Sequence, residues 1–194
     1  MYFSNKEKIF RFIYNFIINL TPFILKGVAL FNPKIKKGIV GRSQTFEKLK
    51  ASISETDKTI WFHCASLGEY EQGLPVFKEI RKLYDSHKIV LSFFSPSGYE
   101  KVDENDLVDH KVYLPIDNYR SAVAFIKKYE PDLAIFVKYE FWYNFIRVLN
   151  QKNIPTVFIS VKLNKGQFIL KSIARPILRE LSKVNRLFVQ DEIS

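Results

Sequence analysis

Trp61-Phe-His-Cys-Ala-Ser-Leu-Gly-Glu-Tyr-Glu-Gln72 is the stretch that decides the fold. Residues 60–64 are apolar or nearly so, which is typical of a buried strand. Ser66 and Gly68 lie in the turn that follows, and Glu69 opens a segment with helical periodicity. Ligands of open α/β sheets bind beyond the strand ends, where Glu69 is expected to lie. The alternative is that Glu69 is only a helix N-terminal acid favourable to the helix dipole, with Gly68 required by the turn.

The rest of the chain repeats this change from strand to helix. The predicted strands are 60–64, 89–94, 111–114, 133–137, 156–160 and 186–189. The predicted helices between them are 69–84, a short one after Pro96, 119–129, 140–150 and 166–182. Strands that alternate with helices predict an α/β fold, with a Rossmann-like parallel sheet covered by helices on both faces.

Composition indicates a folded domain with a basic end. The 194 residues are 47% hydrophobic and 15% aromatic, which excludes a disordered chain. The net charge is +10, and residues 1–50 hold ten basic and two acidic residues, a local excess of +8. This asymmetry favours an anionic partner, either a membrane or a nucleic acid. Cys64 is the single cysteine, so no disulfide framework is expected, and we interpret it as an inert packing residue.

The N-terminal segment, residues 5–31, is apolar and aromatic between basic flanks. Its uncharged run, residues 12–25, is 14 residues long, shorter than the roughly 20 that a spanning helix needs. Asn15 and Asn19 interrupt the apolar stretch, which argues against a signal peptide. We predict a helix, kinked near Pro22, that lies in the membrane interface with lysines on anionic headgroups. The alternative is a helical hairpin that buries these aromatics against the domain.

Three segments follow from this pattern. Residues 1–31 are predicted to be a monotopic membrane-associated helical segment. Residues 32–58 are predicted to be a basic connector with a short helix near 45–51, and 59–194 the Rossmann-like domain. The nucleic-acid alternative is the weakest, because the basic excess adjoins an apolar helix and the sheet domain is nearly neutral. Salt-dependent binding to anionic liposomes, but not to DNA, would support the membrane interpretation.

Familiar cofactor and metal motifs are absent from the sequence. No G-x-G-x-x-G follows the first strand, and no G-x-x-x-x-G-K-[ST] or G-x-S-x-G occurs. His63, His87 and His110 are scattered, without metal-ligand spacing. We therefore predict neither a cofactor nor a metal, and we interpret His63 as a core or rim residue with its hydrogen bonds satisfied.

Polar turns follow the second and third predicted strands. Ser95-Pro-Ser-Gly98 offers Ser95, Ser97 and Gly98 as a cradle for an anion or a sugar. An ordinary turn with Ser95 as N-cap explains the same residues. After the third strand, Asp117 or Asn118 is expected to cap a helix.

The fourth and fifth predicted strands also end in polar residues. Lys138-Tyr-Glu-Phe-Trp-Tyr-Asn144 combines a lysine, the carboxylate of Glu140 and aromatic rings. This mixture suits carbohydrate and lipid headgroups. Asn164 adds a polar group after the fifth strand.

Seven segments resemble the Kdo transferases, which add 3-deoxy-D-manno-octulosonic acid (Kdo) to lipid A precursors. The resemblance covers nearly the whole chain, and the segments are Ala65-Ser-Leu-Gly-Glu69, Ser95-Pro-Ser-Gly-Tyr-Glu-Lys-Val102, Tyr113-Leu-Pro-Ile-Asp117, Pro131-Asp-Leu-Ala-Ile135, Glu140-Phe-Trp-Tyr-Asn144, Asn153-Ile-Pro155 and Lys162-Leu-Asn164. The resemblance implies the N-terminal, acceptor-binding half of a GT-B fold, in which two Rossmann-like halves face a cleft. The chain stops about where the family crosses to its donor-binding half, so we expect these residues alone to lack that half and to be inactive.

The resemblance also implies roles for individual residues. Glu69 matches the family's catalytic base, which deprotonates the acceptor hydroxyl while CMP leaves from the opposite face, inverting the anomeric configuration. No divalent metal is implied. Lys138 replaces a glutamate held to stabilise the transition state, so its catalytic role is a hypothesis. The expected substrate-binding residues are Ser66, Gly68, Ser95, Ser97, Gly98, Glu140 and Asn164.

The implied partners are CMP-Kdo, a lipid A precursor and the anionic surface of the inner membrane at its cytoplasmic face, with no nucleic acid. Two other functions fit the same residues. One is a different lipid-directed GT-B glycosyltransferase. The other is a non-catalytic membrane-bound scaffold, in which Glu69 and the strand-end polar groups would point apart or form structural salt bridges.

Overall fold

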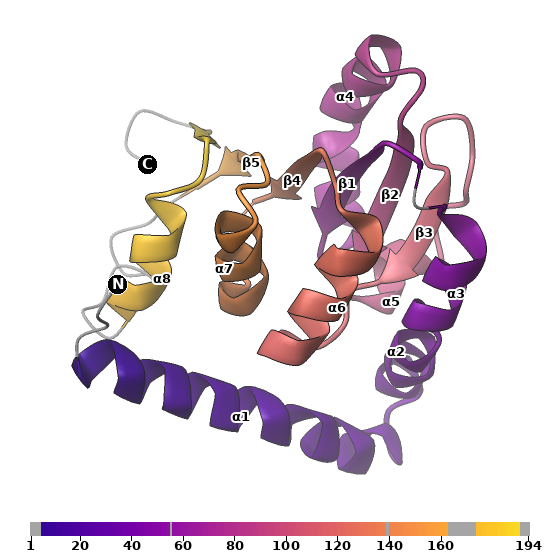
Figure 1. The fold of residues 1–194 in the computed structure, drawn as a ribbon. Coiled ribbons are helices and arrows are strands. Elements are labelled where there is room, and N and C mark those ends of the chain that lie inside the picture. Colours follow the sequence, from indigo (N-terminus) through magenta and orange to yellow (C-terminus); the bar gives the residue numbers. More distant parts are fainter. Residues whose placement is uncertain (1–4, 55, 139, 163–173, 191–194) are drawn as a thin grey trace.

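The structure, a computed structural model, describes residues 5–54, 56–138, 140–162 and 174–190. In these residues, parallel strands form one six-stranded sheet in the order β3-β2-β1-β4-β5-β6 (Figure 1). The strands are β1 (Thr59–Cys64), β2 (Lys88–Phe93), β3 (His110–Tyr113), β4 (Leu133–Val137), β5 (Thr156–Val161) and β6 (Arg186–Val189). This confirms the predicted Rossmann-like α/β sheet. The strand order reverses between β1 and β4, where such sheets bind ligands.

Helices cover both faces of the sheet. Helices α3 (Thr45–Ser52), α6 (Tyr119–Tyr129), α7 (Tyr143–Gln151) and α8 (Arg175–Leu181) contribute to the core on one face, and α4 (Leu67–Leu83) packs on the other. The short helix α5 (Pro96–Tyr99) follows β2. Neighbouring residues of β1 point to opposite faces, so Trp61 lies in the first core and Phe62 in the second. Burial on both sides explains the uninterrupted apolar run of this strand.

Most predicted helices are present with shifted ends. The helix expected at 69–84 begins at Leu67, because Ser66 already takes the N-cap position. The helix expected at 140–150 begins at Tyr143. For the helix expected at 166–182, the described part is α8, and residues 166–173 lie outside the described residues.

Residues 32–58, predicted to be a basic connector, are largely helical. Beyond the expected α3, they form a further helix, α2 (Pro33–Ser43), which begins after the Asn32 cap. Its glycines permit close packing: a Cβ added at Gly38 would lie 2.9 Å from Nη1 of Arg42, and one at Gly41 only 2.1 Å from the Tyr113 ring. Gly41 therefore permits the close packing of α2 against β3, and Gly38 leaves room for the side chain of Arg42.

Helix α1 (Asn5–Ala29) is continuous through Pro22 and runs beside α6, α7 and α8 (Figure 1). Its aromatics are divided between two sides. Phe10 and Tyr14 contact Tyr143, with ring centroids 5.4 and 5.3 Å apart. The other side exposes Ile9, Phe12, Ile13, Phe16, Ile17, Leu20, Phe23, Ile24 and Val28.

The length of this helix bears on the membrane prediction. Glu7–Ala29 has a mean hydropathy of 1.4 and is long and apolar enough to be a candidate membrane span by length and composition. The uncharged run alone is too short, but the helix extends beyond it at both ends. Helix α1 is thus a candidate membrane-associated segment with one side packed on the domain.

Asp117 is the buried residue that attaches α1 to the sheet domain. Its carboxylate accepts hydrogen bonds from Tyr14 Oη at 2.6 Å and from the backbone N–H groups of Asn144 and Phe145 at 3.1 and 3.0 Å. Burial raises the pKa of Asp117 to about 7, although the three donors lower it. Asp117 therefore caps α7 while Asn118 caps α6, so the predicted capping role belongs to both residues.

Two further contacts hold α1 in place. Asn15 accepts a hydrogen bond from Nδ2 of Asn144 at 3.0 Å. Glu7 forms an ion pair with Arg179 of α8. The helix is thus attached near its start and again two turns later.

Candidate functional site

Glu69 lies at the carboxyl end of β1, as the third residue of α4. Its side chain turns back and accepts a hydrogen bond from the backbone N–H of Ala65. Glu69 is only 8% exposed. This contact resembles half of a capping box, but the Ser66 side chain makes no cap hydrogen bond. Glu69 therefore stabilises the helix start and also places a nearly buried carboxylate at the strand end.

The surroundings of Glu69 perturb its ionisation. Burial, together with the negative charge of Glu140, raises the pKa of Glu69 to about 7. Lys138 and the N–H groups of Ala65 and Ser66 act in the opposite direction. Carboxylates with pKa values near neutrality are common among catalytic bases. Glu69, at the end of β1, is thus electrostatically coupled to Lys138 and Glu140, which follow β4. Their roles in binding and catalysis stay predictions.

Lys138 is held in an unusual backbone conformation. Its φ is 64°, in the left-handed region, and its N–H donates to the carbonyl of Ile159 at 2.8 Å. Such conformations cost about 1 kcal/mol or more for a residue with a side chain, and they gather at functional sites. The hydrogen bond to β5 therefore fixes the turn after β4. This contact sets the backbone position from which the side chains of Lys138 and Glu140 extend.

His63 and Trp142 form a hydrogen-bonded layer beneath these charges. The indole N–H of Trp142 donates to Nε2 of His63 at 3.0 Å, so Nδ1 carries the ring proton and contacts Ser92 Oγ at 2.8 Å. Trp61 also donates to Ser92 Oγ, at 2.8 Å. Nε2 of His63 lies 3.8 Å from Glu140. His63 is fully buried, which confirms the predicted satisfied core histidine.

Sequence reasoning missed that this histidine positions Trp142 beside the site. A signal was present in the sheet: His63 pairs with Ser92 across β1 and β2, which places their side chains on the same face. Without the strand order, however, nothing in the sequence connects either residue with Trp142.

The turn after β2 is hydrogen-bonded to the end of β1, next to Glu69. Ser95 N–H donates to the carbonyl of Ala65 at 2.8 Å, and its Oγ accepts from Ser97 N–H at 3.2 Å. Ser95 is therefore an N-cap. Gly98 has a packing role, because an added Cβ would lie 2.2 Å from the Phe93 ring. The sugar-cradle role of this turn stays a prediction.

Gly68 has the opposite environment from Gly98. A Cβ added there would meet no other described atom within 4 Å, and its φ is outside the left-handed region. Neither packing nor backbone conformation requires glycine at this position. The open space next to Glu69 is where a substrate could approach the backbone closely. Asn164, the last predicted site residue, lies outside the described residues.

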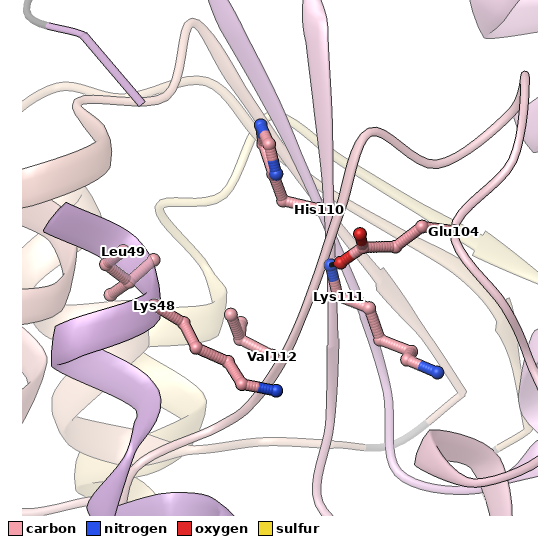
Figure 2. A pocket seen from close by; sticks show the side chains of 6 residues that line it. All are labelled: Lys48, Leu49, Glu104, His110, Lys111 and Val112. Atoms are coloured by element: carbon pink, nitrogen blue, oxygen red, sulfur yellow. Dashed lines mark hydrogen bonds between the residues drawn. The ribbon is translucent and has the colours of Figure 1, made fainter. Parts of the chain in front are cut away.

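A separate hollow of about 240 Å³ lies against the edge strand β3 (Figure 2). Its cations are already engaged: Lys111 donates to the Val102 carbonyl, and Lys48 contacts the hydroxyl of Tyr99. This hollow therefore has a structural role and lies apart from the ends of β1 and β4. Among the described residues, no group of three or more His, Cys, Asp and Glu side chains is arranged to hold a metal ion.

Comparison with known proteins finds a matching family profile and relatives of the same name. A sequence profile of the family "3-Deoxy-D-manno-octulosonic-acid transferase (kdotransferase)" matches residues 40–194. A 3-deoxy-D-manno-octulosonic acid transferase from Aquifex aeolicus (strain VF5) is 31% identical over 127 residues, which cover 65% of this chain and 34% of that protein. The Haemophilus influenzae protein of the same name is 27% identical over 188 residues, 95% of this chain and 44% of the relative.

A further relative, from Fusobacterium nucleatum, carries the name bifunctional glycosyltransferase/methyltransferase. It is 27% identical over 183 residues, which cover 86% of this chain and 27% of that protein. The chain thus spans less than half the length of these curated relatives.

Proposed function

We propose a function for this chain on the premise that it belongs to the 3-deoxy-D-manno-octulosonic acid (Kdo) transferase family. In this proposal, it forms the acceptor-binding half of an enzyme that transfers Kdo from CMP-Kdo to a lipid A precursor. One observation carries the proposal: the nearly buried Glu69 carboxylate lies at the point of strand reversal, with its pKa raised to about 7. A residue there that both accepts and holds a proton near neutrality suits a general base.

In the proposed reaction, a hydroxyl of the acceptor sugar attacks the anomeric carbon of Kdo. Its proton passes to the carboxylate of Glu69 as the new carbon–oxygen bond forms. The bond between the anomeric carbon and the phosphate oxygen breaks, and CMP leaves from the opposite face with the bonding electrons. The anomeric configuration is therefore inverted.

Lys138 and Glu140 adjust this chemistry in opposite directions. The negative charge of Glu140 makes Glu69 a stronger base, whereas the positive charge of Lys138 lowers the pKa of Glu69. We assign to Lys138 the stabilisation of negative charge that develops on the donor phosphate.

The exposed side of α1 supports membrane association, and from the family resemblance we infer that the domain lies on the cytoplasmic face of the inner membrane. Its apolar residues would enter the interface, and the basic residues around it would contact anionic headgroups. The lipid acceptor would then diffuse to the site within the same surface. The liposome and DNA comparison given above tests this part of the proposal.

Transfer by the full-length protein is expected to depend on pH through Glu69. Below its pKa of about 7 the carboxylate is protonated and cannot accept the hydroxyl proton. The value of kcat/KM for CMP-Kdo and lipid A precursor should therefore fall by about tenfold per pH unit on the acid side. Mass spectrometry of the glycolipid product measures the transfer rate at each pH. Absence of Kdo-containing product at every pH contradicts the proposed function, and a flat profile across neutral pH contradicts the role of Glu69.

Gly68→Ala is expected to separate activity from stability. The new methyl group meets no described atom in the fold, and alanine in a first helical turn stabilises by about 0.5 kcal/mol. In the proposed complex the methyl would displace the acceptor, which should reduce kcat/KM by about tenfold to a hundredfold. Thermal unfolding and transfer assays measure both effects.

Gly27→Ala is the matched control, because a Cβ at Gly27 in α1 also meets no described atom within 4 Å. It should leave transfer unchanged. Equal activity of Gly68→Ala and Gly27→Ala would show that no substrate approaches Gly68.

A further inference from the structure

Arg42 is a partly buried cation next to the candidate site. It extends from α2 to the end of β2, where Nη2 donates to the carbonyl of Phe94. Its guanidinium lies over the Phe94 ring, 4.2 Å from the centroid, and Gly38 leaves room for it. Burial lowers the pKa of Arg42.

The hydrogen-bonding capacity of Arg42 is largely unused within the described part of the chain. Its Nε is buried without a hydrogen-bond partner, and no described carboxylate forms an ion pair with it. The rings of Phe94 and Tyr113, 4.2 and 5.6 Å from the guanidinium carbon, stabilise the charge only in part. A buried donor without a partner destabilises a fold, so its retention points to a ligand.

A hollow of about 320 Å³ adjoins this cation. Its polar lining includes Lys34, Arg42 and Ser95, and no carboxylate is among the described residues that line it. Leu25, Ile35, Phe94 and Pro96 make the rest of the lining mainly apolar. Two cations and a hydroxyl beside an apolar wall match a phosphate group carried on an amphiphile.

The hollow is directly connected with the candidate site. Phe94 contacts Trp142 with ring centroids 4.8 Å apart, and Ser95 is hydrogen-bonded to Ala65, which holds Glu69. A group bound in the hollow would therefore lie on the other side of Phe94 from Trp142, along the length of α2 from Lys34 to Arg42.

We propose that this hollow binds a phosphate monoester of the lipid acceptor through Arg42 and Lys34, with apolar acceptor atoms along Leu25 and Ile35. The inference rests on the proposed function and names the part of the acceptor that the site would recognise. Arginine pairs with phosphate through two parallel hydrogen bonds, which gives both strength and orientation.

Binding of a soluble probe tests the site apart from catalysis. Dihexanoyl phosphatidic acid is titrated calorimetrically into the full-length protein. Arg42→Gln should weaken binding by about tenfold, because it removes a charge-assisted pair. Lys34→Gln changes only an exposed side chain and so keeps the fold; it should weaken binding by about threefold.

Lys36→Gln is the matched control, since Lys36 is exposed on the same helix and does not line the hollow. It should bind the probe as the wild type does. Equal affinities of the wild type, Arg42→Gln and Lys34→Gln would overturn the proposal. Inorganic phosphate or dihexanoyl phosphatidylcholine binding as tightly as the probe would overturn it too, because the site would then recognise only an anion or only an acyl chain.

A transfer assay identifies the acceptor as the source of the phosphate. Arg42→Gln should raise KM for the phosphorylated acceptor by about tenfold with a smaller change in kcat. With an acceptor stripped of its phosphates, the wild type and Arg42→Gln should show the same KM. A difference that persists would overturn the assignment. Probe binding by a wild-type protein that transfers no sugar contradicts the proposed function while it supports the phosphate site.

Discussion

Glu69→Gln in the full-length protein is expected to reduce the rate of Kdo transfer by about a hundredfold to ten-thousandfold, because an amide cannot accept the hydroxyl proton. The fold should stay intact, since glutamine can still accept the hydrogen bond from Ala65 N–H at the start of α4. Steady-state transfer of Kdo to lipid A precursor measures the loss, and circular dichroism checks the fold.

The pH dependence of stability gives an independent test of the same residue. The pKa of Glu69 is higher in the folded state than its usual 4.5, so its contribution to stability is fully present at acid pH and is lost as the pH rises through about 7. Glu69→Gln should remove this part of the pH dependence. Glu71→Gln, an exposed substitution in the same helix, should change neither transfer nor the stability profile. Turnover by Glu69→Gln close to that of Glu71→Gln would exclude Glu69 as the base.

Asp117→Ala is expected to lower the free energy of unfolding by about 3 kcal/mol or more. The substitution leaves Tyr14 and two backbone N–H groups at the start of α7 without their acceptor. Each buried, unsatisfied donor costs about 1–3 kcal/mol. Urea unfolding measures the effect as a lower midpoint with an unchanged slope.

Two other variants make this prediction specific. Asn118→Ala removes a single cap hydrogen bond from α6 and should cost about 1 kcal/mol. Tyr14→Phe removes only the contact from α1 and should cost about 1.5–3 kcal/mol, as for a hydrogen bond to a charged group. A loss from Asp117→Ala no greater than that from Asn118→Ala would mean that Asp117 does not hold α1 and α7 together.

The central strands could be predicted from sequence because they are buried on both faces, whereas the residues of β6 are exposed. Continuous apolar runs such as Leu133–Val137 leave little choice of structure, and β4, β6 and α6 have the predicted ends. Helix α2 was not predicted, since Gly38 and Gly41 have the composition of a connector. Gly41 is required by the close approach of the Tyr113 ring, which only the tertiary structure reveals.

The candidate site also has features that the local sequence predicts and features that depend on tertiary structure. Glu69 and Glu140 could be identified as strand-end carboxylates from the local pattern alone. Their electrostatic coupling depends on β1 and β4 being neighbours, although β2 and β3 intervene in the sequence. The contact of Trp142 with His63 also depends on that neighbour relation. Periodicity identifies elements, but it contains no information on the order in which parallel strands assemble.

The attachment of α1 at Glu7, Tyr14 and Asn15 prevents this helix from rotating about its own axis. Its exposed apolar stripe therefore faces a fixed direction relative to Glu69. In the proposed membrane-bound state, the height of the catalytic carboxylate above the bilayer is then a property of the protein, and the lipid composition does not set it. An acceptor would be selected partly by the distance between its reacting sugar hydroxyl and its acyl chains. Helix α1 would thus set the acceptor length that reaches the catalytic carboxylate.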